Sequence, residues 1–488
     1  MDESIVINSK SPMMLQYFVP FNFSNNRFSE ICRTVTDGKQ DGSGCWEETT
    51  FPLEDNTIIY AHVLAMMNVR KNESSVCRSW KYQPEENDRY LFVDHRSREE
   101  QVGVVFSLSD IHIHLCKTGV GFVSYQAVFE NCKRLDSAIL VRFQNRIKKL
   151  NFTNKQLWIL RSRSNAGSEE WNNEPESRKQ VMLGKKILEL IPAGLRPEIQ
   201  FIGTGKDDPV PPASLLFSYV CYNCEDRDRL KETTVHMAMG FDLRNRQSKE
   251  TNQSCHELAN DVFYYVAQGG CAISVISNAE NEYFFVKNSP AAKYSFVLFL
   301  LLYQHCSLLN FTMRLYTDFP SDSQSYLGSS AYAEKMQDFL TDVDTFLMKS
   351  DLSTVSHIQS YNLFYTACRK ALNIEEDKQS LRSGFESLSS IQRSKLALDR
   401  EAQVQAEQEN QEKFNHMVEY LAIILGLIEC LSEGTNFIHR VHLLIRHPSE
   451  LGATDYIGMA LFLAVLVVVV ILFIRIRMIR RAIRRRKR

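Results

Sequence analysis

The feature that most constrains this 488-residue chain is an uncharged apolar run near its C-terminus. Ile457–Ile474 contains no charged residue and no proline, and the nine arginines and lysines of Arg475–Arg488 follow directly with no acid among them. An apolar helix of about 18–20 residues spans the hydrocarbon core of a bilayer, and flanking basic residues stay in the cytoplasm. The sequence therefore predicts a transmembrane helix at 456–475 and a basic cytoplasmic tail at 476–488, next to anionic headgroups.

A shorter apolar stretch, Met417–Leu431, precedes this run and carries Glu419 and Glu429. Together the two stretches predict a helical hairpin, with a first transmembrane helix at 417–437 and an external loop at 438–455. Met1–Lys10 has no signal-peptide pattern. We therefore expect a multi-pass protein of the bacterial inner membrane with both termini in the cytoplasm. A nucleic-acid-binding arm is the weaker interpretation of the basic tail, because the tail adjoins a span, and we expect no direct nucleic-acid binding.

Residues 1–285 have the character of an α+β cytoplasmic domain. The Gly/Asp/Pro-rich stretch near 203–213 leaves open whether this region is one domain or two lobes. Apolar residues at helical spacing predict helices at Asp136–Leu150 and Gln180–Leu190. Short segments rich in β-branched and apolar residues predict strands, at Thr57–Met67, Val102–Leu108, Ile111–Leu115, Gly119–Val128, Ser214–Tyr222, Thr234–Phe241, Val262–Ala267 and Ala272–Ser277.

Residues 286–416 predict a helical bundle and stalk. Tyr294–Asn310 is apolar enough to be a third membrane candidate, but Gln304 and His305 interrupt it, and a long buried helix fits better. Amphipathic helices are predicted at Ser330–Met348 and Asp351–Leu372. From Gln379 to about Phe437 we expect one continuous helix, roughly 85–90 Å long. Its apolar stripe is thin, so the helix is expected to pack beside copies of itself and beside the preceding helices.

This architecture resembles the CorA family of divalent-cation channels. The resemblance rests on the long helix that leads into the first span and on Gly434-Thr435-Asn436, which is similar to the family's Gly-Met-Asn signature. It implies an α+β cytoplasmic domain, a long helical stalk and a two-helix transmembrane hairpin, assembled as a homopentamer whose first span lines the pore. Thr435 stands where the family has methionine, which puts magnesium selectivity in doubt.

A narrower resemblance adds an expected role. Val120-Gly121-Phe122 within Lys117–Gln126, followed by Leu140–Leu150, is similar to the CorA-like effectors of type III CRISPR systems. That resemblance implies that residues 1–285 sense a nucleotide second messenger, such as an S-adenosylmethionine–AMP conjugate. It also implies that the channel is an antiviral defence effector that disturbs ion balance or the membrane.

The candidate pore residues are Gly434, Thr435, Asn436, Glu433 and Glu429. Five Asn436 amides could replace outer-shell waters of a divalent cation, which suits an ion that dehydrates reluctantly. Carboxylates within a span usually face a water-filled cavity, so Glu433 and Glu429 could form cation-attracting rings. The alternative places Glu433 among headgroups and Glu429 at an interhelical contact. Mg²⁺ or another divalent cation is expected as a permeant or regulatory ion, and no resident cofactor is expected.

Candidate residues for a nucleotide ligand form a basic cluster. Phosphate recognition needs fixed positive charge, and helical spacing puts Arg142 and Arg146 on one face. Lys148 and Lys149 follow, and Asp242 with Arg244 forms a second patch. The alternative is a solvated helix face.

Metal and catalytic signals are weak. Cys221 and Cys224 form a lone Cys-x-x-Cys that would need Cys255 and His256 to complete a zinc site. The histidines His112 and His114 alternate on a strand and are interpreted as a surface pair. No nucleophile–base arrangement stands out, so we expect no enzyme activity. Two rival functions remain, a constitutive divalent-cation transporter and a membrane-anchored enzyme or scaffold.

Overall fold

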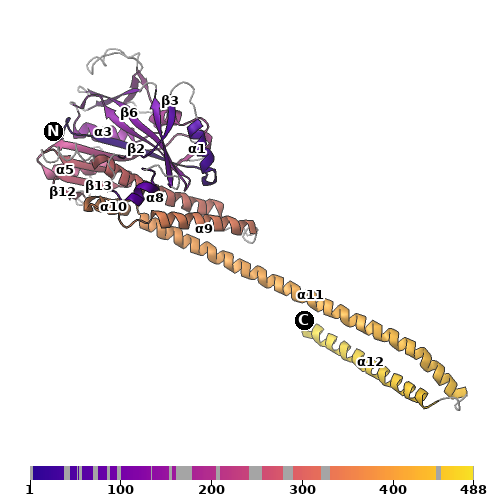
Figure 1. Ribbon diagram of the computed structural model, residues 1–488. Helices are drawn as coiled ribbons and strands as arrows, with labels where there is room; N and C mark the ends of the chain where they lie inside the picture. Colours follow the sequence, from indigo (N-terminus) through magenta and orange to yellow (C-terminus); the bar gives the residue numbers. More distant parts are fainter. Residues whose placement is uncertain are drawn as a thin grey trace. The chain divides into compact units, whose positions relative to one another are not determined.

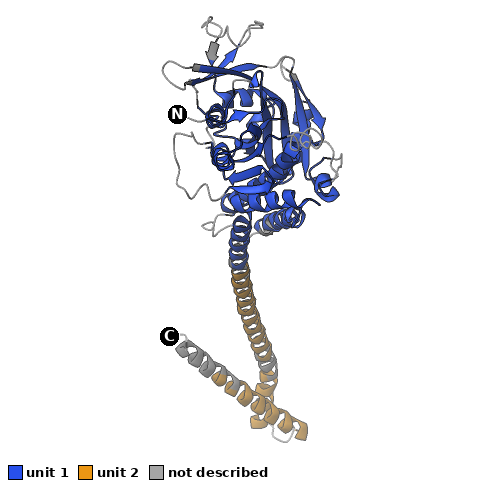
Figure 2. Cartoon of the chain, turned by 90° about the vertical axis from the view of Figure 1, so that its left-hand side faces the viewer, with its two compact units in different colours: residues 1–390 blue, residues 391–488 orange. Residues whose placement is uncertain are grey.

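The computed structural model divides the chain into two compact units, residues 1–390 and residues 391–488 (Figure 2). It describes all residues except 1–3, 38–43, 52, 54–57, 70–74, 85–87, 96–100, 133–134, 153–155, 161–177, 205–208, 241–254, 279–289, 320–329, 447–451 and 487–488. The candidate residues Asp242 and Arg244, and the side chains of Glu429 and Glu433, lie outside the described part.

The described residues of the first unit contain one mixed sheet of fourteen strands (Figure 1). Its main path runs β12-β13-β14-β11-β2-β7-β6-β5-β8-β9, while β1, β10 and β4 pair with β11, β2 and β6, and β3 pairs with β4. All pairs are antiparallel except β11 with β14. The strands are β1 Val6–Ile7, β2 Met14–Asn22, β3 Gly44–Thr49, β4 Cys77–Pro84, β5 Arg89–His95, β6 Gln101–Cys116, β7 Val120–Phe129, β8 Leu157–Leu160, β9 Arg178–Gln180, β10 Gln200–Phe201, β11 Leu215–Asn223, β12 His256–Ala259, β13 Val262–Ala267 and β14 Gly270–Ile276.

Helices cover both faces of this sheet. Its central strand β2 is therefore buried along nearly its whole length. Alternate residues of a strand point to opposite faces. Phe18 enters the core that α2, α8, α9 and α10 close, whereas Tyr17 and Val19 enter the core with α1, α3, α4 and α5. The helices are α1 Phe28–Asp37, α2 Ala61–Met66, α3 Ser137–Ile147, α4 Leu183–Leu190, α5 Arg227–Met239, α8 Pro290–Asp318, α9 Ser330–Ser350, α10 Gln359–Ala371, α11 Ile374–Arg446 and α12 Ala453–Arg486, with 3₁₀ turns η1 Asn25–Arg27 and η5 Arg196–Glu198.

The region 1–285 is one sheet and not two lobes. Strand β2 pairs on one side with β7, through Gln16 opposite Gln126, and on the other with β11, through Phe18 opposite Leu215. Strands from before and after 203–213 are therefore neighbours. The Gly/Asp/Pro-rich stretch connects β10 to β11 within the same sheet.

Two predicted strands are helices. Thr57–Met67 contains α2, whose buried Val63 and Leu64 lie with Met67 at helical spacing. Thr234–Phe241 overlaps α5, which starts where the Asp226 carboxylate accepts bonds from two backbone N–H groups and ends at Gly240, a residue with a φ of 66°. A good N-cap and a glycine C-cap define the helix, and they outweigh the β-branched residues inside it. The other strand predictions of this region, in β6, β7, β11, β13 and β14, are confirmed.

Helix α8 is the buried helix that its interrupted apolar stretch predicts. The most apolar part of α8 is 78% buried. Phe299 lies in the middle of this contact, with ring centroids 5.7 Å from Phe18, 5.2 Å from Phe122 and 4.9 Å from Phe51. Residue 285 is therefore not a domain boundary, because α8, α9 and α10 complete the core of the first unit.

Replacing Phe299 with alanine is expected to lower the free energy of unfolding by about 3–5 kcal/mol, because it empties the centre of this aromatic contact. The matched control is Tyr316→Ala on the same helix, since Tyr316 is 74% exposed, and we expect a change below about 0.5 kcal/mol. Urea unfolding of the full-length protein in detergent, followed by tryptophan fluorescence, measures both. Equal losses for the two variants would contradict a core role for α8.

Candidate functional site

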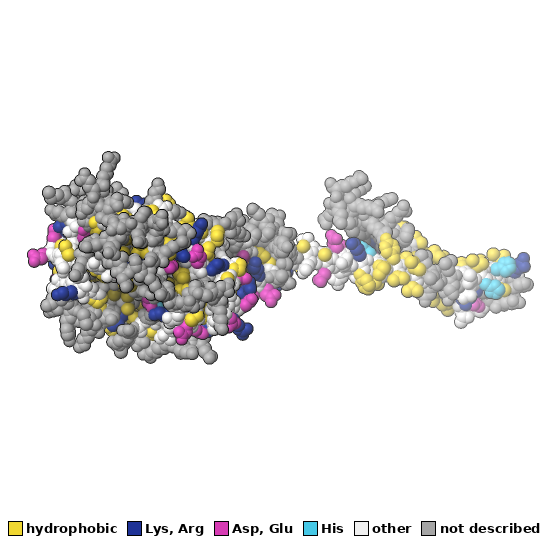
Figure 3. Space-filling view, turned by 90° about the horizontal axis from the view of Figure 1, so that it is seen from above, with side chains coloured by type: hydrophobic (Ala, Val, Ile, Leu, Met, Phe, Trp, Pro, Cys, Tyr) yellow, Lys and Arg dark blue, Asp and Glu magenta, His cyan; other side chains and the backbone are white. Residues whose placement is uncertain are grey.

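Apolar side chains lie exposed along both helices of the second unit, and Figure 3 shows them gathered on its surface. By length and composition, α8 and residues Ala453–Ile471 of α12 are the described segments that could cross a membrane. Whereas α8 is largely buried, the α12 window has a mean hydropathy of 2.4 and is only 6% buried. An apolar surface this continuous needs a cover of lipid or protein. The exposed residues include Leu421, Ile424, Leu425, Ile457, Leu461, Leu466 and Val468.

Helix α11 is longer than predicted, with 73 residues from Ile374 to Arg446. The external loop predicted at 438–455 is therefore too long, since Ile438–Arg446 is helical and α12 starts at Ala453. No proline or glycine interrupts the helix between Thr435 and Arg446. The next proline along the chain is Pro448, and a proline disfavours helix in the residue before it. The tail beyond residue 475 is likewise helical, as α12 continues to Arg486.

The two helices of the hairpin meet on one face of α11. The rings of Phe437 and Phe462 stack at 5.0 Å between centroids, and Arg440 Nε lies 3.4 Å from Asp455 Oδ1. A methyl group at Gly434 would lie 3.5 Å from Phe462 Cζ. Gly434 and Phe437 are three residues apart and share the face that packs on Phe462, whereas Arg440 lies four residues from Asn436 and reaches Asp455 from the neighbouring face. The Gly434-Thr435-Asn436 motif thus lies inside a helix and not at its end.

Thr435 and Asn436 lie outside this contact, and both are exposed in the single chain. Positions 429, 433 and 436 follow one another at four and three residues, which puts them on one face of α11 by helical spacing. The candidate pore residues are therefore divided between two faces. Gly434 contacts α12, whereas Asn436 shares its face with positions 429 and 433.

The predicted basic cluster of α3 does not form an open anion site. Arg142 makes a two-point ion pair with Asp94, with Nε–Oδ1 and Nη2–Oδ2 distances of 2.8 Å, and the Asp94 side chain is 1% exposed. Asp94 lies 48 residues earlier, on β5. The guanidinium charge is thus used to neutralise a buried carboxylate, and losing either partner would leave an uncompensated charge.

Lys148 is also engaged, because its Nζ donates a 2.6 Å hydrogen bond to the Met239 carbonyl oxygen at the end of α5. Burial is the main reason that the pKa of Lys148 is lowered, and the positive charge of Lys149 lowers it further. Arg146 and Lys149 are exposed. Two of the four cations therefore support the fold, and the structure does not bring the four together around a common cavity.

The histidines share a strand face as predicted, with ring centroids 5.7 Å apart, but the expected surface position is wrong. His112 and His114 are each 1% exposed. The nitrogens of His114 lie 2.8 Å from Ser79 Oγ and 3.0 Å from Ser124 Oγ. Burial lowers the pKa of both histidines, so they are neutral members of the core below α8. Within the described residues, no group of three or more His, Cys, Asp or Glu could hold a metal ion.

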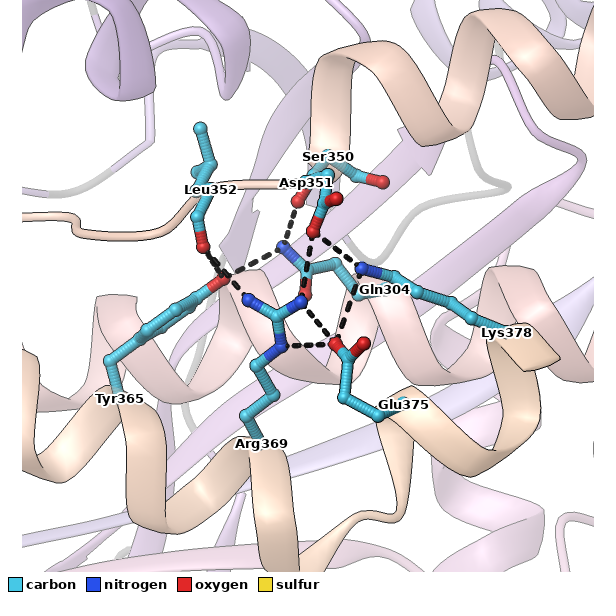
Figure 4. Close-up of polar contacts among 8 residues, drawn as sticks. All are labelled: Gln304, Ser350, Asp351, Leu352, Tyr365, Arg369, Glu375 and Lys378. Atoms are coloured by element: carbon cyan, nitrogen blue, oxygen red, sulfur yellow. Dashed lines mark hydrogen bonds and ion pairs between the residues drawn. The ribbon is translucent and has the colours of Figure 1, made fainter.

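A cluster of charges that the sequence did not single out holds the start of α11 (Figure 4). Lys378 Nζ lies 2.7 Å from Asp351 Oδ1, and Arg369 Nη2 lies 2.9 Å from the same oxygen. Arg369 Nε also donates to Glu375 Oε1 at 2.6 Å. Asp351 follows α9, Arg369 belongs to α10, and Glu375 and Lys378 lie in the first turns of α11. We call these four residues the α11 junction.

Hydrogen bonds to backbone carbonyls complete the α11 junction. Gln304 of α8 donates to the Ser350 carbonyl at 2.8 Å, and Tyr365 of α10 donates to the Leu352 carbonyl at 3.0 Å. Arg369 donates to that same Leu352 carbonyl at 2.9 Å. The segment after α9 is thereby fixed from three helices. Only the spacing of Glu375 and Lys378 could be noticed in the sequence, because the other partners are distant along the chain.

The pKa of Asp351 is lowered, first by its hydrogen bond to Lys378 and further by the charge of Lys378 and the contact with Arg369. A carboxylate with a lowered pKa stabilises the fold above its ordinary pKa of 3.8, and this contribution is lost as the pH falls through the lowered value. The Asp351 carboxylate is therefore charged throughout the neutral range.

No protein-family model, curated protein or solved structure matches this chain.

Replacing Lys378 with methionine is expected to loosen the first turns of α11, because it removes a charge that is only 7% exposed while keeping the length of the side chain. Asp351 is half exposed, so we expect a loss of about 1 kcal/mol in local stability. Hydrogen–deuterium exchange of the peptides covering 374–381 measures it. Lys370→Met, at an exposed position of α10, is the control and should leave exchange unchanged. If both variants exchange alike, the ion pair does not hold the helix.

Proposed function

We propose that this chain forms an oligomeric, CorA-like membrane ion channel in which α11 lines the pore. The observation that carries the proposal is that one helix, α11, joins the folded domain to the segment that would line the pore. Helix α11 begins in the α11 junction of the folded domain, and farther along it presents Thr435 and Asn436 on a surface that α12 does not cover.

The exposed apolar side chains support a membrane location. Lipid would cover the outer face of α12, and neighbouring copies of α11 would cover the sides of the pore helix, since polar groups within a membrane are tolerated where they line a water-filled cavity. We propose a homopentamer from the resemblance to the CorA family. We propose the bacterial inner membrane from the same resemblance, and the basic residues after Ile474 support a cytoplasmic C-terminus.

The proposed permeant ion is a divalent cation such as Mg²⁺. Asn436 would offer uncharged oxygens to a hydrated ion, and carboxylates at positions 433 and 429 on the same face would concentrate cations. Thr435 in place of the family's methionine changes the neighbouring surface from a thioether to a hydroxyl.

Opening would be regulated through the α11 junction. A ligand shifts a closed–open equilibrium only if it binds the two states with different affinity, and a rearrangement around Asp351 would reach α11 directly. This junction favours a regulated channel over a constitutive transporter and over an anchored enzyme or scaffold. A nucleotide second messenger as the ligand and an antiviral defence role stay predictions from the resemblance. The α3 cluster adds no support for a nucleotide site, because two of its four cations are engaged elsewhere.

The oligomer is tested by native mass spectrometry of the full-length protein released from detergent. We expect a particle of five copies of the 56.4-kDa chain, because five α11 helices would bury the polar pore face away from lipid. A monomer or dimer under conditions that keep the protein folded would contradict a channel, since two helices cannot enclose a pore.

Flux of Mg²⁺ into proteoliposomes tests the pore face. We expect Asn436→Ala and Glu433→Ala each to reduce or alter cation flux by about tenfold, because each removes a ring of ligands at a constriction. Ile438→Ala is the matched control, since position 438 lies two residues on, opposite Asn436 around the helix, and is 69% exposed. Unchanged flux in Asn436→Ala and Glu433→Ala would show that the pore lies elsewhere.

A further inference from the structure

A hollow of about 470 Å³ lies in the first unit, apart from the α11 junction. It is lined by the end of β2 and turn η1, by the segment after η5, and by facing residues of α8 and α9. Pockets for small molecules have volumes of roughly 300–1,000 Å³. The hollow therefore has the size of a ligand site, and its chemistry is set by the side chains that face it.

One donor in this hollow lacks an acceptor. Arg314 Nη1 is buried and makes no hydrogen bond. The guanidinium forms only long ion pairs, with Nη1 3.6 Å from Asp342 Oδ2 and Nε 3.9 Å from Asp318 Oδ2. The guanidinium is held in place by the ring of Phe339, whose centroid is 5.1 Å from Arg314 Cζ. Arginine presents its donors as a planar fork that matches a carboxylate. Arg314 thus lines the hollow with one N–H donor that has no hydrogen bond, beside carboxylates with which it makes only long ion pairs.

Several acceptors face the same hollow. Asn22 Oδ1 is buried and has no hydrogen-bond partner among the described residues. Asp338 is exposed on α9, and Asp342 accepts a 2.7 Å hydrogen bond from Asn25 Nδ2. These carboxylates do not form a group that could hold a metal ion. Acceptors that are spaced apart in this way suit N–H donors such as those of an ammonium group.

We propose that this hollow binds a small zwitterion, a free α-amino acid or a close analogue. The α-carboxylate would accept from Arg314, and the α-ammonium would donate to Asp338, Asp342 and Asn22. Buried polar groups are costly when unsatisfied, and a zwitterion satisfies the orphan donor and the orphan acceptor together. The remaining volume takes the side chain and water.

Binding would fasten α8 to α9, because Arg314 and the two aspartates belong to these two helices. The same helices reach the α11 junction through Gln304 and through the segment that follows Ser350. A regulatory effect of the zwitterion on ion flux rests on the proposed channel function. Binding itself does not depend on it.

The test measures binding to the full-length protein in detergent by thermal shift and by isothermal titration calorimetry, with each of the twenty amino acids as probe. We expect at least one amino acid to raise Tm and to bind measurably. Glutarate, which lacks the ammonium, and cadaverine, which lacks the carboxylate, should each leave Tm unchanged.

Two variants locate the site. Asp338→Ala and Arg314→Lys should weaken binding about tenfold or more, because the first removes an acceptor for the ammonium and the second removes the planar fork of donors. The control Glu334→Ala, exposed on α9 outside the hollow, should bind like the unchanged protein. The absence of any amino-acid binding, equal shifts with cadaverine or glutarate, or wild-type affinity in Asp338→Ala and Arg314→Lys would each overturn the proposal. Flux is measured separately, so a failure of the channel leaves the binding result intact.

Discussion

The uncovered apolar surface of α11 and α12 is the constraint on which this structure depends. In water, exposed residues such as Leu425, Leu461 and Val468 would drive association, and the long polar part of α11 gains little from a lone helix. Lipid can cover α12, because its window carries no charge apart from Asp455 near its start. Lipid alone cannot cover α11, which places Asn436 and two glutamate positions on one face. In the proposed channel, association of α11 helices satisfies both requirements.

The opposite end of α11 is held by a different kind of interaction. Its first turns are fixed by ion pairs of Lys378 and Arg369 with Asp351 and Glu375. Both carboxylates are more than half exposed, and such pairs contribute about 0–1 kcal/mol each because water screens them. This attachment is specific in geometry but weak in energy. The attachment is therefore far weaker than an apolar core contact such as that of Phe299, and for this reason the proposed regulation of opening is assigned to the α11 junction.

Elements whose signal lies in their own residues can be predicted from the sequence. Contacts between residues that are distant along the chain cannot. The uncharged run of α12, the interrupted run of α8 and the β-branched and apolar residues of β7 and β13 each contain their own signal. The ion pair of Arg142 does not, because Asp94 lies on another strand, and the basic cluster of α3 therefore looked like an anion site. Helix α5 was missed because Thr233, Thr234 and Val235 outweighed a cap at Asp226. The α11 junction and the hollow around Arg314 exist only once α8, α9 and α10 are packed.

The position of Gly434 sharpens the interpretation of the motif. A glycine inside a continuous helix costs about 1 kcal/mol relative to alanine, and at Gly434 a methyl group would make only an ordinary contact, 3.5 Å from Phe462 Cζ. Neither helix stability nor the packing of the hairpin accounts for this glycine. The neighbouring Gly458 differs, because a methyl group there would clash with the guanidinium of Arg440. Gly434 is therefore not explained by how α11 folds or by how it packs on α12. In the proposed channel, its place on the face toward α12 leaves local bending of the helix near Asn436 as the use of such a residue.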